Sequence, residues 1–382
     1  MDSRHVDHPV YIQSNEDLLR FCRQWMNCEI LALDTEFIRT DTFYPKGALI
    51  QVSDGTGCFL IDPLPIDDFS PFKDLLENEQ IVKILHSCSE DLEVFDTLFG
   101  IVPHPIFDTQ IAASMVGYGY SLGYQAMTEK LLSIHVPKGE TRSNWLQRPL
   151  TTSQIHYAAL DVAYLPEMYL MLMGLLQEKG RLQWMQEECS LLVKSIPDEE
   201  KINSHYIKVK SAWKLTGQQL TLLQRLVQWR EIEARHKNIP RGRVVKDRCC
   251  FDIAQLQPQS LPELGRISEL PQKLIRQDGE MIIDLVKDVK NTSETEYLEP
   301  LQRPLPPETG SILKRLQSHI IHRAEHLQLA PEILARKKDH EALIRSVFYD
   351  NSDELPVALS GWRKSVVGDE LLEILKAQRR KS

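Results

Sequence analysis

Hydrophobic and polar positions follow two different periods along the first half of the chain. Short apolar runs are separated by stretches that are apolar at every third or fourth residue. The runs predict strands at residues 30–33, 48–53, 58–61 and 81–85, and a helical period follows at 69–77. Strands that alternate with helices in this way predict an α/β layer architecture.

The ends of one helix are indicated by its flanking residues. Ser89 precedes a helical pattern over residues 90–99, and Gly100 follows it. A serine side chain caps the start of a helix well, and glycine readily adopts the left-handed conformation that ends one. The pattern therefore predicts Ser89 as the N-cap and places Asp91 in the first turn, beside free backbone amides.

A second helix is predicted by a capping box. Thr151 and Gln154 have the S/T-x-x-E/Q spacing in which each side chain accepts a hydrogen bond from the other residue's backbone. The helix runs through Tyr157 and Asp161, which stand one turn apart on the same face. Pro166 predicts a kink soon afterwards.

The second half of the chain has only helical periodicity. Polar or proline-rich linkers are predicted at residues 196–201 and 291–307. A weak repeat at an offset of 90 residues pairs the segment 222–226 with 312–316. These boundaries predict three domains, at residues 1–195, 210–290 and 300–382.

Charge is distributed unevenly between these parts. The 382 residues have a net charge of −9, but residues 1–195 hold 14 Lys and Arg against 27 Asp and Glu, a net charge of −13. The remainder holds 31 against 27, a net charge of +4. A carboxylate-rich part followed by a mildly basic part suits a metal-dependent catalytic domain with appended binders of polyanions, although two ordinary solvated surfaces would give the same numbers.

Cysteine usage and hydropathy predict a cytoplasmic protein. The seven cysteines form no C-x-x-C pair, as is common for chains in a reducing compartment. The polar start of the chain lacks the features of a signal peptide. The longest apolar stretch, near residues 168–176, is interrupted by Gly174 and is far shorter than the roughly 20 residues that span a bilayer.

Four acidic residues and one tyrosine are the candidate catalytic set. Asp34 and Glu36 alternate at the end of a strand pattern, so both carboxylates point to one face. With Asp91, Tyr157 and Asp161 they offer hard oxygen ligands without Cys or His, which favours Mg²⁺ or Mn²⁺ over zinc. Two such ions about 4 Å apart hydrolyse phosphodiesters. Each acid by itself has an ordinary structural explanation, as a strand end, a helix start or a solvated helix face, so only the set is informative.

The segments around these residues resemble a known family. They resemble the three exonuclease motifs of the tyrosine subclass of the DEDD superfamily, most closely those of the bacterial ribonuclease D family, and the similarity spans most of residues 20–175. The segments are 34–37, 86–95 and 157–162. Asn144 departs from the aspartate that relatives often carry before the tryptophan of a neighbouring loop.

The resemblance implies a fold, a reaction and a role for each residue. The fold would be a ribonuclease-H-like mixed sheet flanked by helices. Asp34 would bridge two divalent ions, Glu36 and Asp161 would help to hold the first, Asp91 would support the second partly through water, and Tyr157 would orient the attacking water. The expected activity is 3′-to-5′ removal of nucleotides from RNA as 5′-monophosphates, with 3′-extended precursor tRNA as substrate.

The helical half resembles the paired HRDC modules of the same family, two small all-α domains. Residues 226–235 are similar to the signature segment of the first module, and residues 360–363 to the end of the second. We expect both modules to capture RNA, in a monomer without an obligate protein partner or a membrane. The candidate phosphate contacts are Lys138, Arg142, Arg148, Arg230 and Arg235.

Three other functions are compatible with parts of the sequence. A DNA-directed 3′-to-5′ exonuclease would use the same metals and tyrosine, and a noncatalytic RNA-binding scaffold would have no need for the intact acidic set. A G-x-S-x-G segment at residues 119–123 suggests a serine hydrolase. That motif needs a preceding strand, whereas residues 111–115 have a helical pattern.

Overall fold

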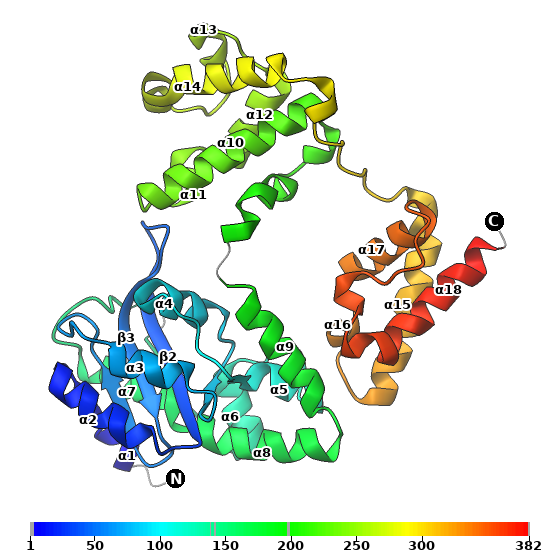
Figure 1. The fold of residues 1–382 in the computed structure, drawn as a ribbon. Helices are drawn as coiled ribbons and strands as arrows, with labels where there is room; N and C mark the ends of the chain where they lie inside the picture. The colour runs from blue at the N-terminus through cyan, green and yellow to red at the C-terminus, as the bar shows by residue number, and fades with distance from the viewer. Residues whose placement is uncertain (1–3, 138, 141–142, 197–198, 381–382) are drawn as a thin grey trace. The chain divides into compact units, whose positions relative to one another are not determined.

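The chain forms two compact units. The computed structural model describes residues 4–137, 139–140, 143–196 and 199–380 (Figure 1). Unit 1 consists of Met1–Ile38, Gly47–Ile196 and Leu305–Ser382. Unit 2 consists of Arg39–Lys46 and Pro197–Pro304.

Unit 1 contains a six-stranded sheet with the strand order β1-β4-β3-β2-β5-β6. Its strands are β1 Val10–Ile12, β2 Ile30–Ile38, β3 Lys46–Ser53, β4 Cys58–Ile61, β5 Val82–Leu85 and β6 Ile106–Asp108. The pairs β1–β4, β2–β5 and β5–β6 are parallel, whereas β3 and β4 are antiparallel. The expected mixed sheet is therefore confirmed. Both outer strands, which the sequence did not predict, have only three residues each.

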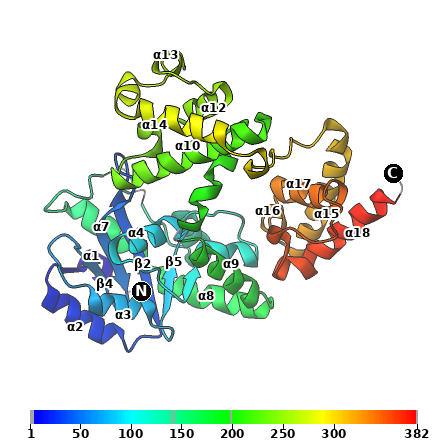
Figure 2. The ribbon, with the colours of Figure 1, turned by 45° about the horizontal axis from the view of Figure 1, so that its top comes forward.

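Helices pack around this sheet, and Figure 2 shows them from a second direction. In the first part of unit 1 they are α1 Arg4–Asp7, α2 Asn15–Trp25, α3 Ser70–Glu77, α4 Ser89–Phe99, α5 Thr109–Val116, α6 Tyr124–Leu132, α7 Thr152–Ala163, α8 Leu165–Glu178 and α9 Leu182–Lys194. Helix α7 contacts β2 and β4, and α8 contacts β2 and β5. The sheet and these helices bury large apolar side chains such as Trp25, Phe72 and Phe95.

The predicted helix ends were correct in part. Thr151 and Gln154 form the expected capping box of α7. Gly100 ends α4 in the left-handed conformation, with φ of 68°. The prediction of Ser89 as N-cap is wrong, because the helix begins at Ser89 itself and Cys88 occupies the N-cap position without a side-chain hydrogen bond.

Pro166 separates two helices instead of kinking one. Helix α7 ends at Ala163 and α8 begins at Leu165, with the proline in its first turn, where a missing amide hydrogen costs nothing. Together they form a run of 27 residues, Thr152–Glu178, which contains an 18-residue window with a mean hydropathy of 1.4 and is long and apolar enough to cross a membrane by these criteria alone. Half of its apolar window is buried inside the protein, and core helices of soluble proteins meet the same criteria.

The C-terminal module, defined as residues 305–382, belongs to unit 1. Its helices are α15 Gly310–Leu327, α16 Pro331–Leu334, α17 Lys337–Phe348 and α18 Asp369–Arg379. Leu316, Leu343 and Leu371 belong to the same continuous apolar cluster as the side chains around the sheet. The module and the sheet therefore share one hydrophobic core.

Unit 2 has a core of its own. Its helices are α10 Gly217–His236, α11 Arg241–Val244, α12 Asp247–Leu256, α13 Leu261–Leu264 and α14 Gln272–Asn291, preceded by a 3₁₀ helix at Glu199–Lys208. Leu222, Phe251 and Ile282 lie in its buried cluster. Phe43, from the segment between β2 and β3, is buried in the same cluster.

Candidate active site

Strand β2 presents two acids to helix α7. Residues 31–33 are buried, and the strand then continues through Asp34, Thr35 and Glu36. Because side chains alternate along a strand, Asp34 and Glu36 share one face and Thr35 points to the other. The apolar part of β2 thus holds both carboxylates at a defined place in the sheet.

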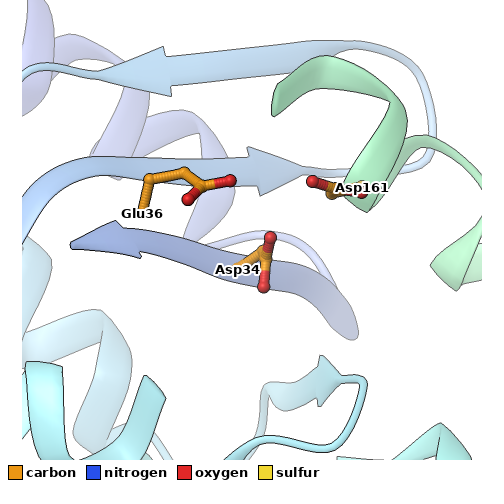
Figure 3. Close-up of side chains that lie close together, drawn as sticks. All are labelled: Asp34, Glu36 and Asp161. Atoms are coloured by element: carbon orange, nitrogen blue, oxygen red, sulfur yellow. The ribbon is translucent and has the colours of Figure 1, made fainter. Parts of the chain in front are cut away.

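Helix α7 adds the third acid of the cluster. Asp34, Glu36 and Asp161 each offer a carboxylate oxygen, and these oxygens lie within 4.8 Å of one another. Figure 3 shows the three side chains directed toward a common space between the strand and the helix. The expected convergence of residues more than 120 positions apart in the sequence is therefore present for these three.

Asp91 lies beside this cluster but outside it. It is only 7% exposed and accepts a hydrogen bond of 2.5 Å from the Thr35 hydroxyl. Its charge still contributes to the raised pKa values of Asp34, Glu36 and Asp161. The fourth acid is thus close enough to interact electrostatically, while its nearest partner is the residue between the two strand acids.

Burial raises the pKa of all four carboxyl groups, and the charge of a neighbouring carboxylate adds to the rise in each case. Burial, the largest cause, raises the pKa of Glu36 to about 9 and those of Asp91 and Asp161 to about 7. The pKa of Asp34 lies well above its ordinary value, through burial first and then the charge of Asp91. Carboxylates held together in this way are unfavourable unless a cation compensates them.

The donor set fits hard divalent cations. Three carboxylates whose oxygens lie within 4.8 Å of one another supply only oxygen ligands, which suit Mg²⁺ and Mn²⁺. The three side chains are neither fully buried nor fully exposed, so an ion has access to them. This site can hold a divalent metal.

Tyr157 stands one helical turn before Asp161 and interacts with it. A hydrogen bond from Tyr157 lowers the pKa of Asp161 and partly offsets the effect of burial. Burial, followed by the charges of Asp161 and Glu36, raises the pKa of the Tyr157 phenol far above its ordinary value. The phenol therefore remains protonated at neutral pH and acts as a hydrogen-bond donor, not as a base.

Two polar neighbours of the cluster were not found from the sequence. Tyr124 donates a hydrogen bond of 2.6 Å to the Leu160 carbonyl, and the charges of Asp161 and Asp34 contribute to its raised pKa after burial, the largest cause. Thr35 was recognised only as the residue between the two acids. No spacing rule connects Tyr124 to helix α7, so the sequence carried no signal for it.

The Arg148 side chain is fully engaged inside the protein. Its guanidinium donates two hydrogen bonds to Asp62, of 2.5 and 2.8 Å, and one of 2.6 Å to the Ala48 carbonyl. Two more, of 2.7 and 2.8 Å, reach the carbonyls of Trp145 and Gln147. All five N–H groups are used, which favours a structural role over the expected contact with phosphate.

Two of the other candidate phosphate contacts are paired with carboxylates inside unit 2. In unit 2, Arg230 is 5% exposed and donates to Asp247 at 2.5 Å, and Arg235 donates to the buried Glu231 at 3.0 Å. Both arginines thus have carboxylate partners within their own unit. Lys138 and Arg142 lie outside the described residues.

Comparison with known proteins identifies the class of two parts of the chain. The profile of a 3′-5′ exonuclease family matches residues 9–177, and that of the HRDC domain matches residues 219–286. The exonuclease match contains all four acids and Tyr157. The first part of the chain is therefore a 3′-5′ exonuclease domain.

Full-length relatives define the family. Ribonuclease D of Pseudomonas paraeruginosa is 43% identical over 367 residues, covering 96% of this chain and 97% of that protein. Ribonuclease D of Haemophilus influenzae is 36% identical, covering 98% and 94%. The crystal structure of Escherichia coli RNase D, described as an exoribonuclease involved in structured RNA processing, superimposes with a TM-score of 0.88 at 33% identity, covering 97% of this chain and 99% of that one.

The chain belongs to the ribonuclease D family. The expected class of enzyme, an exoribonuclease of the ribonuclease D type, is thereby confirmed, as are the exonuclease domain and one HRDC domain.

Proposed function

We propose that this enzyme removes nucleotides one at a time from the 3′ end of precursor tRNA and other small structured RNAs, and releases 5′-mononucleotides. The observation that carries the proposal is the convergence of Asp34, Glu36 and Asp161 beside Tyr157 in an exonuclease domain. E. coli RNase D, which acts in structured RNA processing, has the same fold. The tyrosine at this position supports assignment to the tyrosine subclass.

The four acids and the tyrosine have separate roles in this reaction. Asp34, Glu36 and Asp161 would hold one divalent ion, and Asp34 with Asp91 would hold a second, either Mg²⁺ or Mn²⁺. When bound, such ions stabilise the charge that develops on the phosphodiester and provide a nucleophilic water. Tyr157 stays protonated, so its hydroxyl donates a hydrogen bond and orients the water that attacks phosphorus.

The remaining parts of the chain are assigned to RNA binding and domain organisation. We infer an exonuclease domain at residues 1–195 and HRDC domains at residues 210–290 and 300–382. The first HRDC domain is the one that the family profile also matches. The net charge of +4 after residue 195 supports attraction of RNA, which the strongly acidic catalytic part would otherwise repel.

The decisive experiment uses a 3′-extended tRNA with Mg²⁺ or Mn²⁺ and resolves the products nucleotide by nucleotide. The Asp34→Asn variant should lose turnover by at least about 10³-fold while it binds the RNA as the wild type does, because it removes a metal ligand and no RNA contact. Asp67→Asn, at an exposed aspartate, is the matched control and should be fully active. Near-normal turnover by Asp34→Asn would contradict the proposed site.

A matched DNA oligonucleotide separates the two exonuclease functions. An RNA-directed enzyme should degrade the RNA strand many times faster than the DNA strand of the same sequence. A preference for DNA would replace the proposed function with a repair or proofreading exonuclease.

A further inference from the structure

The segment that resembles the end of the second HRDC module lies against helix α9 within unit 1. Trp362 is only 5% exposed. Its ring stacks on that of Trp184, with ring centroids 4.5 Å apart and an angle of 14° between the planes. A nucleobase needs an accessible ring face to stack on an aromatic side chain, and Trp362 is too enclosed to offer one.

Glu188 of α9 binds both polar groups of this segment. Its carboxylate accepts a hydrogen bond of 2.8 Å from the Trp362 indole N–H. It also accepts two from the Arg363 guanidinium, of 2.5 and 3.2 Å. The Nε–H of Arg363 donates to the Ile333 carbonyl at 3.0 Å, and the guanidinium lies 4.4 Å from the centre of the Trp362 ring. A bidentate arginine–carboxylate pair of this kind is specific in geometry as well as in charge.

Gly361 is required for the close approach of Glu187. The backbone N–H of Trp362 donates to the two Glu187 carboxylate oxygens at 3.1 and 3.3 Å. A Cβ atom at position 361 would lie 1.6 Å from one of these oxygens, and Gly361 also has φ of +58°, which other residues rarely adopt. The glycine, the tryptophan and the arginine of the segment are thus all explained by contact with α9.

A buried arginine strengthens the same contact near the start of α9. Arg181 is 8% exposed and donates one hydrogen bond of 2.7 Å to the Met115 carbonyl of α5. A second, also of 2.7 Å, reaches the Leu327 carbonyl at the end of α15. Two parts of unit 1 that are distant in sequence are therefore joined by one side chain whose burial makes the loss of either bond costly.

We propose that Gly361, Trp362 and Arg363 are docking residues that hold the C-terminal module on helix α9, and that they do not contact RNA. The C-terminal module is then a fixed structural part of the catalytic unit. This inference goes beyond the proposed function, and only its statement about RNA depends on that function.

The Arg363→Lys variant tests the proposal directly. Lysine keeps the positive charge that a phosphate would need but loses the bidentate contact with Glu188. We expect the melting transition of unit 1 to fall by at least about 4 °C. The dissociation constant for a 3′-extended tRNA, measured by fluorescence anisotropy in a chelator to prevent turnover, should stay within about twofold of the wild-type value.

Two further variants control this experiment. Lys364→Ala removes an exposed charge from the adjacent residue and should change neither quantity. Glu188→Gln weakens the same contact from the α9 side. The double variant with Arg363→Lys should lower the melting temperature by much less than the sum of the two single decreases, because both substitutions act on one pair.

The possible outcomes distinguish the hypotheses. An unchanged melting temperature in Arg363→Lys, or RNA binding at least tenfold weaker at unchanged stability, overturns the docking role. If the wild-type protein does not bind the tRNA at all, the proposed function fails, while the stability measurements still decide whether these residues dock the module.

Discussion

Replacing Glu36 by glutamine should stabilise the metal-free protein at alkaline pH, although it removes a candidate metal ligand. Burial and the charges of Asp161 and Asp91 raise the pKa of Glu36 from 4.5 to about 9. At pH values between 4.5 and about 9, the Glu36 carboxyl group loses its proton in the unfolded chain and keeps it in the folded protein. Because the folded state then binds more protons, its stability falls as pH rises through this range.

The size of the effect follows from this pKa difference. Each pH unit above 4.5 costs about 1.4 kcal/mol, so the penalty is roughly 1 kcal/mol at pH 5 and roughly 5 kcal/mol at pH 8. Glutamine removes the penalty but leaves a buried amide, at a cost of about 1–3 kcal/mol. We therefore expect Glu36→Gln to gain about 2–4 kcal/mol at pH 8 and to show no gain, or a small loss, at pH 5.

Calorimetry in a chelator at pH 5, 6.5 and 8 measures this dependence. The relevant transition belongs to unit 1 and is identified in the wild type by its upward shift in Mn²⁺. Glu79→Gln, at an exposed position of the same unit, is the matched control and should show no dependence on pH beyond that of the wild type. Added Mn²⁺ should stabilise the wild type more than Glu36→Gln, because the variant has lost a ligand.

The comparison at pH 8 is the critical one. If Glu36→Gln is less stable than the wild type there in chelator, the pKa of Glu36 is not raised in the folded protein as proposed. The grouped carboxylates would then not need a cation to compensate their charge, and the metal assignment would lose its electrostatic support.

Other variants test the remaining parts of the site. Tyr157→Phe should lower kcat by about 10–100-fold without changing the melting temperature, because it removes one hydroxyl and keeps the ring; an unchanged kcat would show that the phenol does not position the water. Arg148→Ala should destabilise unit 1 by about 3–5 kcal/mol, since it leaves the buried Asp62 unpaired, and urea unfolding measures this loss; a stable variant with weakened RNA binding would restore Arg148 as a phosphate contact. In chelator the wild-type unit 1 should be less stable at pH 8 than at pH 6, and the stabilisation by Mn²⁺ should be larger at pH 8, as calorimetry can show; a gain that is the same at both pH values would contradict the raised pKa values.

Much of the catalytic domain could be predicted from local pattern. The capping box at Thr151, the end of α4 at Gly100 and the strand ending in Asp34 are all decided by residues within one turn or one strand of the feature. Short-range rules failed at the start of α4, where Cys88 and not Ser89 occupies the N-cap position. They also failed for three-residue strands such as β1, which are stabilised only by the neighbouring strands of the sheet.

For the active site as well, local sequence pattern predicted one part and tertiary packing decided the other. Its candidate residues could be chosen from the sequence, because alternation along β2 and helical spacing on α7 define which side chains share a face. The place where they meet could not be predicted. The 4.8 Å grouping of Asp34, Glu36 and Asp161 and the hydrogen bond from Thr35 to Asp91 depend on how α4 and α7 pack against β2.

The charged residues depended most on tertiary structure. Arg148 was expected from the sequence to contact RNA, and Arg363 stood only in a segment similar to an HRDC module, but each has a buried or half-buried carboxylate partner more than 80 residues away. Local pattern determines which element a residue belongs to, because backbone and side-chain periodicity act over a few residues. Only the packed chain decides whether a charge faces solvent or a partner, because burial and electrostatic pairing are set by contacts between distant segments.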